Sequence, residues 1–286
     1  MDIVVPIKQV PETSNVKMDP KTGTMIRDGV ETVVNPLDLF AIETALRLKE
    51  AHGGTVTALS MGPKGAEKAL REAIAMGCDG GVLVSDRAFA GSDSWATSYT
   101  LSQAIRQMGR FDLIVAGERA TDGDTGQVGP GIAAWLDLPL ATYVAAITRV
   151  DPDEGRLTVE RLVEEGYQVL ELPLPALLTV VKEIAAPRLP MLRGKKRAKA
   201  AEVPLYTAAT MDLEPAFLGL KGSPTRVVKV ATPKVTRGGT VVQAKDAEAV
   251  AGAVDRLLAF LDARDLLPHD GAPAGGAAAE QAGGRP

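Results

Sequence analysis

The residues of this sequence that are best suited to chemistry lie in one stretch, GERATDGDTGQVGP, which runs from residue 117 to residue 130. It follows the apolar run FDLIVA and precedes GIAAWL, so we expect a loop between a buried strand and a helix. Gly123, Gly126 and Gly129 would let the main chain approach a ligand closely. Backbone N–H groups at the start of a helix attract phosphate, and Thr125 and Gln127 would add side-chain donors. The pattern predicts a phosphate-binding loop.

The same loop carries three carboxylates, Glu118, Asp122 and Asp124, which would repel a phosphate. We therefore expect the backbone amides to supply the attraction and the carboxylates to point elsewhere. Asp122 or Asp124 would accept backbone N–H bonds that stiffen the loop, or one of them would accept from a ribose hydroxyl. In the alternative interpretation both are solvated turn residues.

Other kinds of site find little support in the sequence. The two histidines, His52 and His269, have no neighbouring cluster of metal ligands, so we expect neither a zinc site nor a histidine-activated nucleophile. Cys78 is the sole cysteine, which excludes a disulfide within the chain. Neither G-x-G-x-x-G nor the P-loop motif occurs.

Composition narrows the class of protein. Hydrophobic residues make up 45% of the 286 residues, which is enough for a packed core. A net charge of −4 and an aromatic content of 4% argue against nucleic acid binding. The first residues, MDIVVPIKQV, do not resemble a signal peptide, and no apolar run approaches the roughly 20 residues of a membrane span. We expect a soluble, cytoplasmic protein.

The elements that would position the loop alternate between strand and helix. Apolar runs at residues 2–7, 55–62, 81–86 and 111–117 predict strands, and residues 35–54, 64–77, 92–109 and 131–136 predict helices. Asn35 is the expected N-cap of the first helix, with Pro36 at its first position. Residues 16–18 and 24–26 flank a predicted turn, DPKTG. This alternation predicts an α/β fold, a doubly wound and mostly parallel Rossmann-like sheet.

The pattern changes after Pro139. Residues 142–150 and 156–163 flank the turn DPDEG and predict an antiparallel extension, and residues 167–181 are expected to be extended and buried. A basic loop, or a loop leading into a helix, is predicted at 186–200. An extended segment at 224–235 and a helix at 246–263 follow, and these predict a C-terminal arm. We therefore divide the chain into an α/β domain (1–221), an arm (222–267) and a disordered tail (268–286).

A doubly wound sheet binds its ligands beyond the carboxyl ends of its strands, where the strand order reverses. Four segments would meet there: Pro6 to Lys8, Asn35, Ser60 to Gly62, and the loop at 117–129. Their convergence favours a nucleotide, although four ordinary turns would give the same pattern.

Three longer stretches resemble one family. GERATDGDTGQVGPGIAAWLDLP is similar to the nucleotide loop of the β subunit of electron-transfer flavoprotein, and residues 5–50, from VPIKQV to RLKE, resemble its N-terminal part. TVVKEIAAPRLPMLRGKKRAK resembles its signature and recognition loop. The resemblance covers roughly residues 1–205. It implies a heterodimer in which the α subunit carries an FAD and the β subunit holds a nucleotide.

The resemblance leaves two kinds of member open. Housekeeping members hold AMP as a structural ligand, whereas Fix-type, electron-bifurcating members hold a second FAD in the same pocket. AMP-type members typically have a more acidic residue at the position of Gly123, and Cys-Asn in place of Thr125-Gly126. They also often carry a tyrosine where this chain has PETSN. DGDTGQVGP and LRGKKRAK resemble the Fix type, so the expected cofactor is FAD, with AMP as the alternative.

The resemblance also implies roles for residues and partners. NADH would be the electron donor, and electrons would pass to the α-subunit FAD and to ferredoxin or flavodoxin, with an acyl-CoA dehydrogenase or quinone oxidoreductase as a docking partner. The chain would act as an electron-transfer subunit within the heterodimer. For Met61, the alternative role is packing in the core. Leu192 is the implied anchor for a partner, and its alternative is an ordinary buried leucine within a solvated basic run. The implied cofactor-binding residues are Pro6, Asn35, Met61, Asp122, Gly123, Asp124, Thr125, Gly126, Gln127, Val128 and Gly129.

Overall fold

The computed structural model describes residues 1–12, 31–228, 239 and 241–267. The predicted turn DPKTG with its flanking strands, and the predicted disordered tail, lie outside these residues. The chain divides into two compact units, Met1–Val230 and Ala231–Pro286, which are described separately below. Among the described residues, no helix is both long enough and apolar enough to cross a membrane.

Nine strands of the described residues form the central sheet of the first unit, in the order β11-β5-β4-β1-β6-β10-β7-β8-β9. The strands from β11 to β7 are parallel, and β8 and β9 are antiparallel to their neighbours. The strand order reverses between β1 and β6. The bounds are β1 (Asp2–Pro6), β4 (Thr55–Met61), β5 (Gly80–Val84), β6 (Leu113–Gly117), β7 (Leu140–Asp151), β8 (Arg156–Val163), β9 (Gly166–Pro173), β10 (Ala176–Val180) and β11 (Leu205–Tyr206).

Helices cover both faces of this sheet. Side chains of β1 alternate between two cores, with Ile3 and Val5 in one and Val4 in the other. The first core is closed by α1 (Asp38–His52) and α2 (Glu67–Met76), and the second by α3 (Ser94–Met108) and α4 (Val128–Leu136). Because the central strands are covered on both faces, they are continuous apolar runs. The doubly wound α/β fold expected from the sequence is confirmed.

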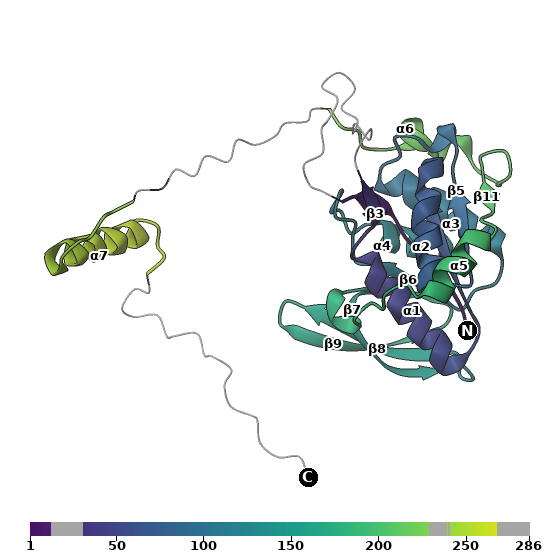
Figure 1. Cartoon of the computed structure of the whole chain (residues 1–286), viewed down its shortest axis with the longest axis horizontal. Helices are drawn as coiled ribbons and strands as arrows, with labels where there is room; N and C mark the ends of the chain where they lie inside the picture. Colours follow the sequence, from purple (N-terminus) through teal and green to yellow (C-terminus); the bar gives the residue numbers. More distant parts are fainter. Residues whose placement is uncertain (13–30, 229–238, 240, 268–286) are drawn as a thin grey trace, which may run out of the picture. The chain divides into compact units, whose positions relative to one another are not determined.

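The remaining elements of the first unit are short. The helix α5 (Leu192–Ala200) packs on α2 (Figure 1). The short helix α6 (Gly219–Gly222) comes after α5 in the sequence. A separate pair of strands, β2 (Gln9–Pro11) and β3 (Thr32–Val34), is antiparallel. Four 3₁₀ helices are present among the described residues, η1 (Lys64–Ala66), η2 (Arg87–Phe89), η3 (Lys182–Ile184) and η4 (Pro215–Phe217).

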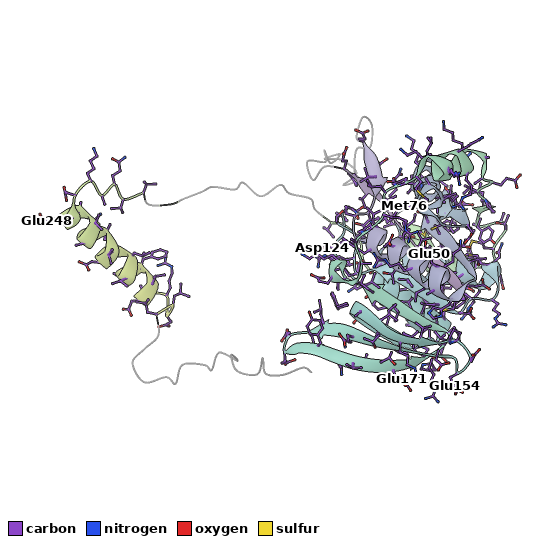
Figure 2. All side chains as sticks on the ribbon, turned by 60° about the horizontal axis from the view of Figure 1, so that its bottom comes forward. Glu50, Met76, Asp124, Glu154, Glu171 and Glu248 are labelled. Carbon is purple, nitrogen blue, oxygen red and sulfur yellow. The ribbon has the colours of Figure 1, made fainter. Side chains whose placement is uncertain are left out.

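The antiparallel extension predicted after Pro139 is formed by β7, β8 and β9. Figure 2 shows Glu154 and Glu171 on this extension, away from Asp124 of the loop that follows β6. The expected burial of residues 167–181 is correct only for the second half. The strand β10 is fully buried, but β9 is an edge strand, and Tyr167 and Val169 are exposed. An edge strand that extends beyond the covering helices stays in contact with water.

The first helix begins later than the sequence predicted. Asn35 and Pro36 precede it in a turn, and α1 starts at Asp38. Asn35 is therefore not the N-cap, and its side-chain amide instead donates to the carboxylate of Asp38 and to the carbonyl of Arg119. In the second unit, the predicted helix is α7 (Ala247–Asp262), and Val250, Val254 and Leu257 are exposed along it.

Candidate functional site

A cavity of about 880 Å³ lies at the carboxyl edge of the parallel sheet. Its wall is formed by segments that follow β1, β4, β5 and β6, so it lies at the point where the strand order reverses. Pro6, Met61 and residues 123–129 line it, as the sequence analysis expected of a ligand site. Three of the four predicted segments therefore meet around one cavity.

The loop between β6 and α4 has a backbone that needs glycine at some positions and not at others. Gly126 has a φ of 63°, in the left-handed region, and a Cβ at Gly129 would lie 2.6 Å from Cγ2 of Thr179. A Cβ at Gly123 would meet no atom within 4 Å, so the main chain does not require glycine there. Asp124 also has a positive φ, of 55°.

The backbone N–H groups at the start of α4 are available to a ligand. The N–H groups of Gly123 and Asp124 both donate to the carbonyl of Ala120. For residues 125–129, no hydrogen bond from a backbone N–H to another described residue is present. A run of free N–H groups at the N-terminus of a helix attracts an anion.

The three carboxylates of the loop are paired with cations. Asp122 accepts from Lys8 Nζ at 2.6 Å, and Asp124 accepts from Arg119 Nε at 2.7 Å. Glu118 lies 3.5 Å from the same guanidinium. The expected bonds from backbone N–H groups to Asp122 and Asp124 are not present among the described residues. The ion pairs instead reduce the negative charge that the loop presents to the cavity.

Asn35 does not line the cavity but supports its wall. The side chain is fully buried, and its Nδ2 donates to the carbonyl of Arg119 at 2.9 Å. Its Oδ1 accepts from the N–H of Thr121 at 3.2 Å. Asp122 is likewise absent from the lining, although Lys8, its partner, is part of it. Neither residue faces the cavity: Asn35 fixes the backbone of the loop between β6 and α4, and Asp122 pairs with the charge of Lys8.

Asp38 is a buried carboxyl in the cavity wall, a position that was not predicted from the sequence. Its Oδ2 accepts from the backbone N–H of Lys8 at 2.7 Å, and its Oδ1 accepts from Asn35 Nδ2 at 2.9 Å. Burial outweighs these bonds and raises the pKa of Asp38 from 3.8 to about 7. The carboxyl is thus partly protonated near neutral pH.

The segment after β5 was not predicted from the sequence to reach the cavity, but it contributes Asp86, Arg87, Asp93 and Ser94 to the lining. Asp93 caps α3 by accepting from the N–H groups of two residues in its first turn. Ser94 Oγ donates to Oε1 of Gln127 at 2.8 Å, which leaves the amide nitrogen of Gln127 free to donate. The rule applied to β1, β4 and β6 would have found this segment, because β5 also ends at the same edge.

Met61 and Leu192 had two interpretations each. Met61 lines the cavity and also packs against the second core, so both of its roles are compatible with its position. Leu192 is 85% exposed at the start of α5, which excludes an ordinary buried leucine. Leu189, which was not considered, is exposed to the same extent. The role of Leu192 in docking stays a prediction.

Comparison with known proteins identifies the family. The model of the electron transfer flavoprotein domain matches residues 22–211. The electron transfer flavoprotein subunit beta of Thermoanaerobacterium thermosaccharolyticum is 47% identical over 258 residues, covering 90% of this chain and 98% of that protein. The chain belongs to the electron transfer flavoprotein family.

Other relatives narrow the position within the family. Protein FixA of Azotobacter vinelandii is 47% identical over 238 residues, with 82% of this chain and 85% of that protein covered. The Caffeyl-CoA reductase-Etf complex subunit CarD of Acetobacterium woodii is 44% identical, with 89% and 96% covered. The similarity to β subunits and to FixA places the chain with the β subunits of the Fix type, as its motifs predicted.

Proposed function

We propose that this chain is the β subunit of a heterodimeric, electron-bifurcating flavoprotein and that it binds FAD in the cavity at the carboxyl edge of the sheet. In this proposal electrons from NADH reach the α-subunit FAD and a low-potential carrier, ferredoxin or flavodoxin. The observation that carries the proposal is the cavity itself, with the free backbone N–H groups of residues 125–129 on its wall.

The size of the cavity favours a dinucleotide. Ligand pockets in proteins span roughly 300–1,000 Å³, and this one, at about 880 Å³, lies near the upper end. A diphosphate fits the start of α4, where the N–H groups of Gly126, Val128 and Gly129 and the side chains of Thr125 and Gln127 would hold it. AMP alone would leave much of this volume to water.

When bound, FAD would supply the redox chemistry, and the residues of this chain would bind it, orient it and limit water. The pairing of Asp122 with Lys8 and of Asp124 with Arg119 lowers the repulsion that an anionic ligand meets. Asp38 acts in the same sense, because burial raises its pKa to about 7 and so favours the neutral form in the wall. Arg87 adds a cation to the lining from the segment after β5.

The docking of a dehydrogenase is part of the proposal. Leu192 is exposed beside Arg193, Lys195 and Lys196, so an apolar side chain would enter a partner pocket while the charges attract its acidic rim. The name of CarD places that relative in a complex with a caffeyl-CoA reductase. This supports a partner that acts on CoA esters, such as an acyl-CoA dehydrogenase, with a quinone oxidoreductase as the other candidate.

The α subunit is the proposed partner of the second unit. On α7, the apolar side chains Val254, Leu257, Leu258 and Phe260 are all exposed within that unit. A helix with such a face needs another surface to cover it. We expect that the chain expressed alone aggregates or binds nucleotide poorly, and that co-expression with the α subunit gives a stable one-to-one complex. A monodisperse, fully flavinated single chain would contradict this.

The decisive experiment counts the nucleotides. The heterodimer is purified and denatured, released FAD and AMP are quantified, and reduction of the intact complex by NADH is followed. The proposal requires two FAD and no AMP per heterodimer, with bleaching of the flavin by NADH. One FAD and one AMP would instead establish the housekeeping type, and no flavin would leave a nucleotide-binding module without redox work.

A further inference from the structure

Three apolar side chains project from the surface in one short segment. Leu189, Met191 and Leu192 are 85%, 64% and 85% exposed, and Pro190 lies between the first two. We call residues 189–192 the docking segment. Isolated exposed apolar residues are common, but a cluster held in a fixed position marks a binding surface. The contacts that fix the docking segment therefore decide whether it can act as a binding surface.

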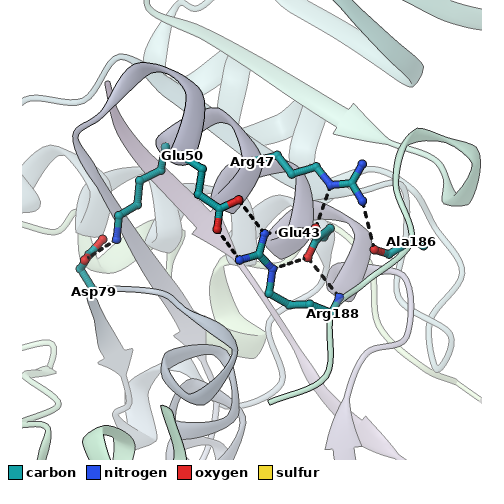
Figure 3. A network of polar contacts seen from close by, with 7 residues as sticks. Glu43, Arg47, Glu50, Asp79, Ala186 and Arg188 are labelled. Atoms are coloured by element: carbon teal, nitrogen blue, oxygen red, sulfur yellow. Dashed lines mark hydrogen bonds and ion pairs between the residues drawn. The ribbon is translucent and has the colours of Figure 1, made fainter. Parts of the chain in front are cut away.

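On its N-terminal side, the docking segment is fixed by Arg188. The guanidinium of Arg188 donates from Nε to Oε2 of Glu43 at 2.8 Å, and from Nη1 and Nη2 to the two carboxylate oxygens of Glu50 at 2.5 and 3.0 Å (Figure 3). The backbone N–H of Arg188 also donates to Glu43, at 3.1 Å. Both the side chain and the main chain immediately before Leu189 are thus tied to α1. We call Arg188, Glu43 and Glu50 the clamp.

The clamp is anchored by a buried carboxylate. The side chain of Glu43 is 4% exposed, and Arg47 donates to its second oxygen at 2.8 Å. Burial opposes ionisation of Glu43, but hydrogen bonds from Arg188 and Arg47 outweigh it and hold the pKa below its usual value. The pKa of Glu50 is also lowered, chiefly by its hydrogen bond with Arg188. Both carboxylates are therefore charged at neutral pH, and the bidentate geometry restricts the guanidinium to one orientation.

On its C-terminal side, the docking segment continues into α5, which is held against α2. A Cβ at Gly194 would collide with the carbonyl oxygen of Ala75, so the two helices approach closely there. Arg197 Nη2 donates to the carbonyls of Ile74 and Cys78 at 2.8 and 2.9 Å. The segment is thus fixed at both ends by contacts with residues more than a hundred positions earlier in the chain, while its own side chains remain free.

We propose that Arg188 is a positioning residue, which holds the docking segment in its binding conformation before a partner arrives. Ordering flexible side chains and loops on association lowers affinity, and a preformed surface avoids that loss. The proposal rests on the docking role given to Leu192 above and adds the residues that make the surface rigid. It concerns a partner with an apolar pocket and an acidic rim, since Arg193, Lys195 and Lys196 follow the segment directly.

Positioning and long-range attraction predict different results for two substitutions. Arg188→Lys keeps the charge but loses the fork that binds both carboxylates. Glu50→Gln removes a negative charge near the basic residues, so attraction of an acidic partner would improve, whereas the clamp would weaken. A loss of affinity in both variants is explained by positioning and not by charge. Glu50 is exposed, so this variant does not disturb the core.

The test measures electron transfer between the intact heterodimer and the acyl-CoA dehydrogenase or quinone oxidoreductase of the source organism, whichever reacts with the unmutated complex. We expect Arg188→Lys and Glu50→Gln each to raise KM for the heterodimer about tenfold, the factor equivalent to about 1.4 kcal/mol, with kcat unchanged. The matched controls are Arg156→Lys and Glu171→Gln, which alter an exposed ion pair on the antiparallel extension and should leave KM unchanged. Hydrogen exchange of the backbone amides of Leu189 and of residues 191–193 should be faster in the two clamp variants and unchanged in the controls.

Leu192→Ala separates the two proposals. If Leu192→Ala raises KM, and the double variant with both Arg188→Lys and Leu192→Ala has a KM no higher than that of Leu192→Ala alone, the clamp acts through the docking segment. If Leu192→Ala raises KM but Arg188→Lys does not, or if Glu50→Gln lowers KM, the positioning proposal is wrong and docking at Leu192 stands. If Leu192→Ala leaves KM unchanged, the docking role itself is refuted, and the clamp with it.

Discussion

Substitution of Asp38 by Asn tests whether burial keeps this carboxyl of the cavity wall protonated up to near neutral pH. Burial raises the pKa of this carboxyl from 3.8 to about 7, and one pKa unit corresponds to about 1.4 kcal/mol. The shift from 3.8 to about 7 therefore means that folding favours the protonated carboxyl of Asp38 over the charged one by about 4 kcal/mol. Between these pKa values the folded state keeps the proton that the unfolded state has released. Protonation of Asp38 therefore stabilises the folded protein at low pH, and this contribution is lost as pH rises through about 7.

An asparagine side chain cannot titrate, so the Asp38→Asn variant lacks this dependence. It also loses one of the two hydrogen bonds from Lys8 and Asn35, which would lower stability by about 1 kcal/mol at every pH. We expect the free energy of unfolding of the original heterodimer, relative to the variant, to fall by up to about 1.4 kcal/mol per pH unit as pH rises from about 5 to about 7. Urea unfolding of both complexes at several pH values measures this difference.

The control is Asp86→Asn, in another part of the cavity wall. Hydrogen bonds from the backbone N–H groups of Ala88 and Ala208 hold the pKa of Asp86 below its usual value, so its contribution to stability is lost only in acid. The stability difference for this control should be flat from about pH 5 to about pH 8. The infrared band of a protonated carboxyl should be present at about pH 6 in the original complex and absent in Asp38→Asn. A pH-independent difference for Asp38→Asn, or no such band, would refute the reasoning.

Four further substitutions have clear expectations. Gly126→Ala places a side chain at a φ of 63°, which costs about 1–2 kcal/mol, so it should reduce the flavin content of the purified heterodimer. Gly123→Ala should leave the flavin content unchanged. Equal losses in the two variants would contradict the different roles assigned to these glycines. Gly194→Ala should lower the free energy of unfolding by about 1–3 kcal/mol, because its Cβ collides with Ala75, and calorimetry that finds an unchanged melting temperature would show that α5 adapts. Leu192→Ala should leave flavin content and melting temperature unchanged, and a lower melting temperature would show a structural role for this side chain.

The sequence by itself determined the architecture. Apolar runs and helical spacing placed β1, β4, β5 and β6 and the helices between them, because burial of a periodic face is a local property of the chain. The same rule located three of the segments around the cavity, because the carboxyl ends of parallel strands meet at one edge. The glycines and the helix start at residues 123–129 also indicated the ligand loop before any contact was known.

Only the tertiary structure decided how the charged and polar side chains are paired. The sequence predicted Asn35 as the N-cap of a helix, but the fold brings its side chain to a loop 84 residues away, where it bonds to the main chain of Arg119 and Thr121. Asp122 is paired with Lys8 across 114 residues, and Arg188 with Glu43 across 145. Spacing along the chain carries no information about such pairs, since a buried charge is stable only where the fold supplies its counter-charge. Of the three carboxylates in the phosphate loop, Glu118 and Asp124 are paired within the loop by Arg119, and only Asp122 depends on a cation, Lys8, that folding brings to it.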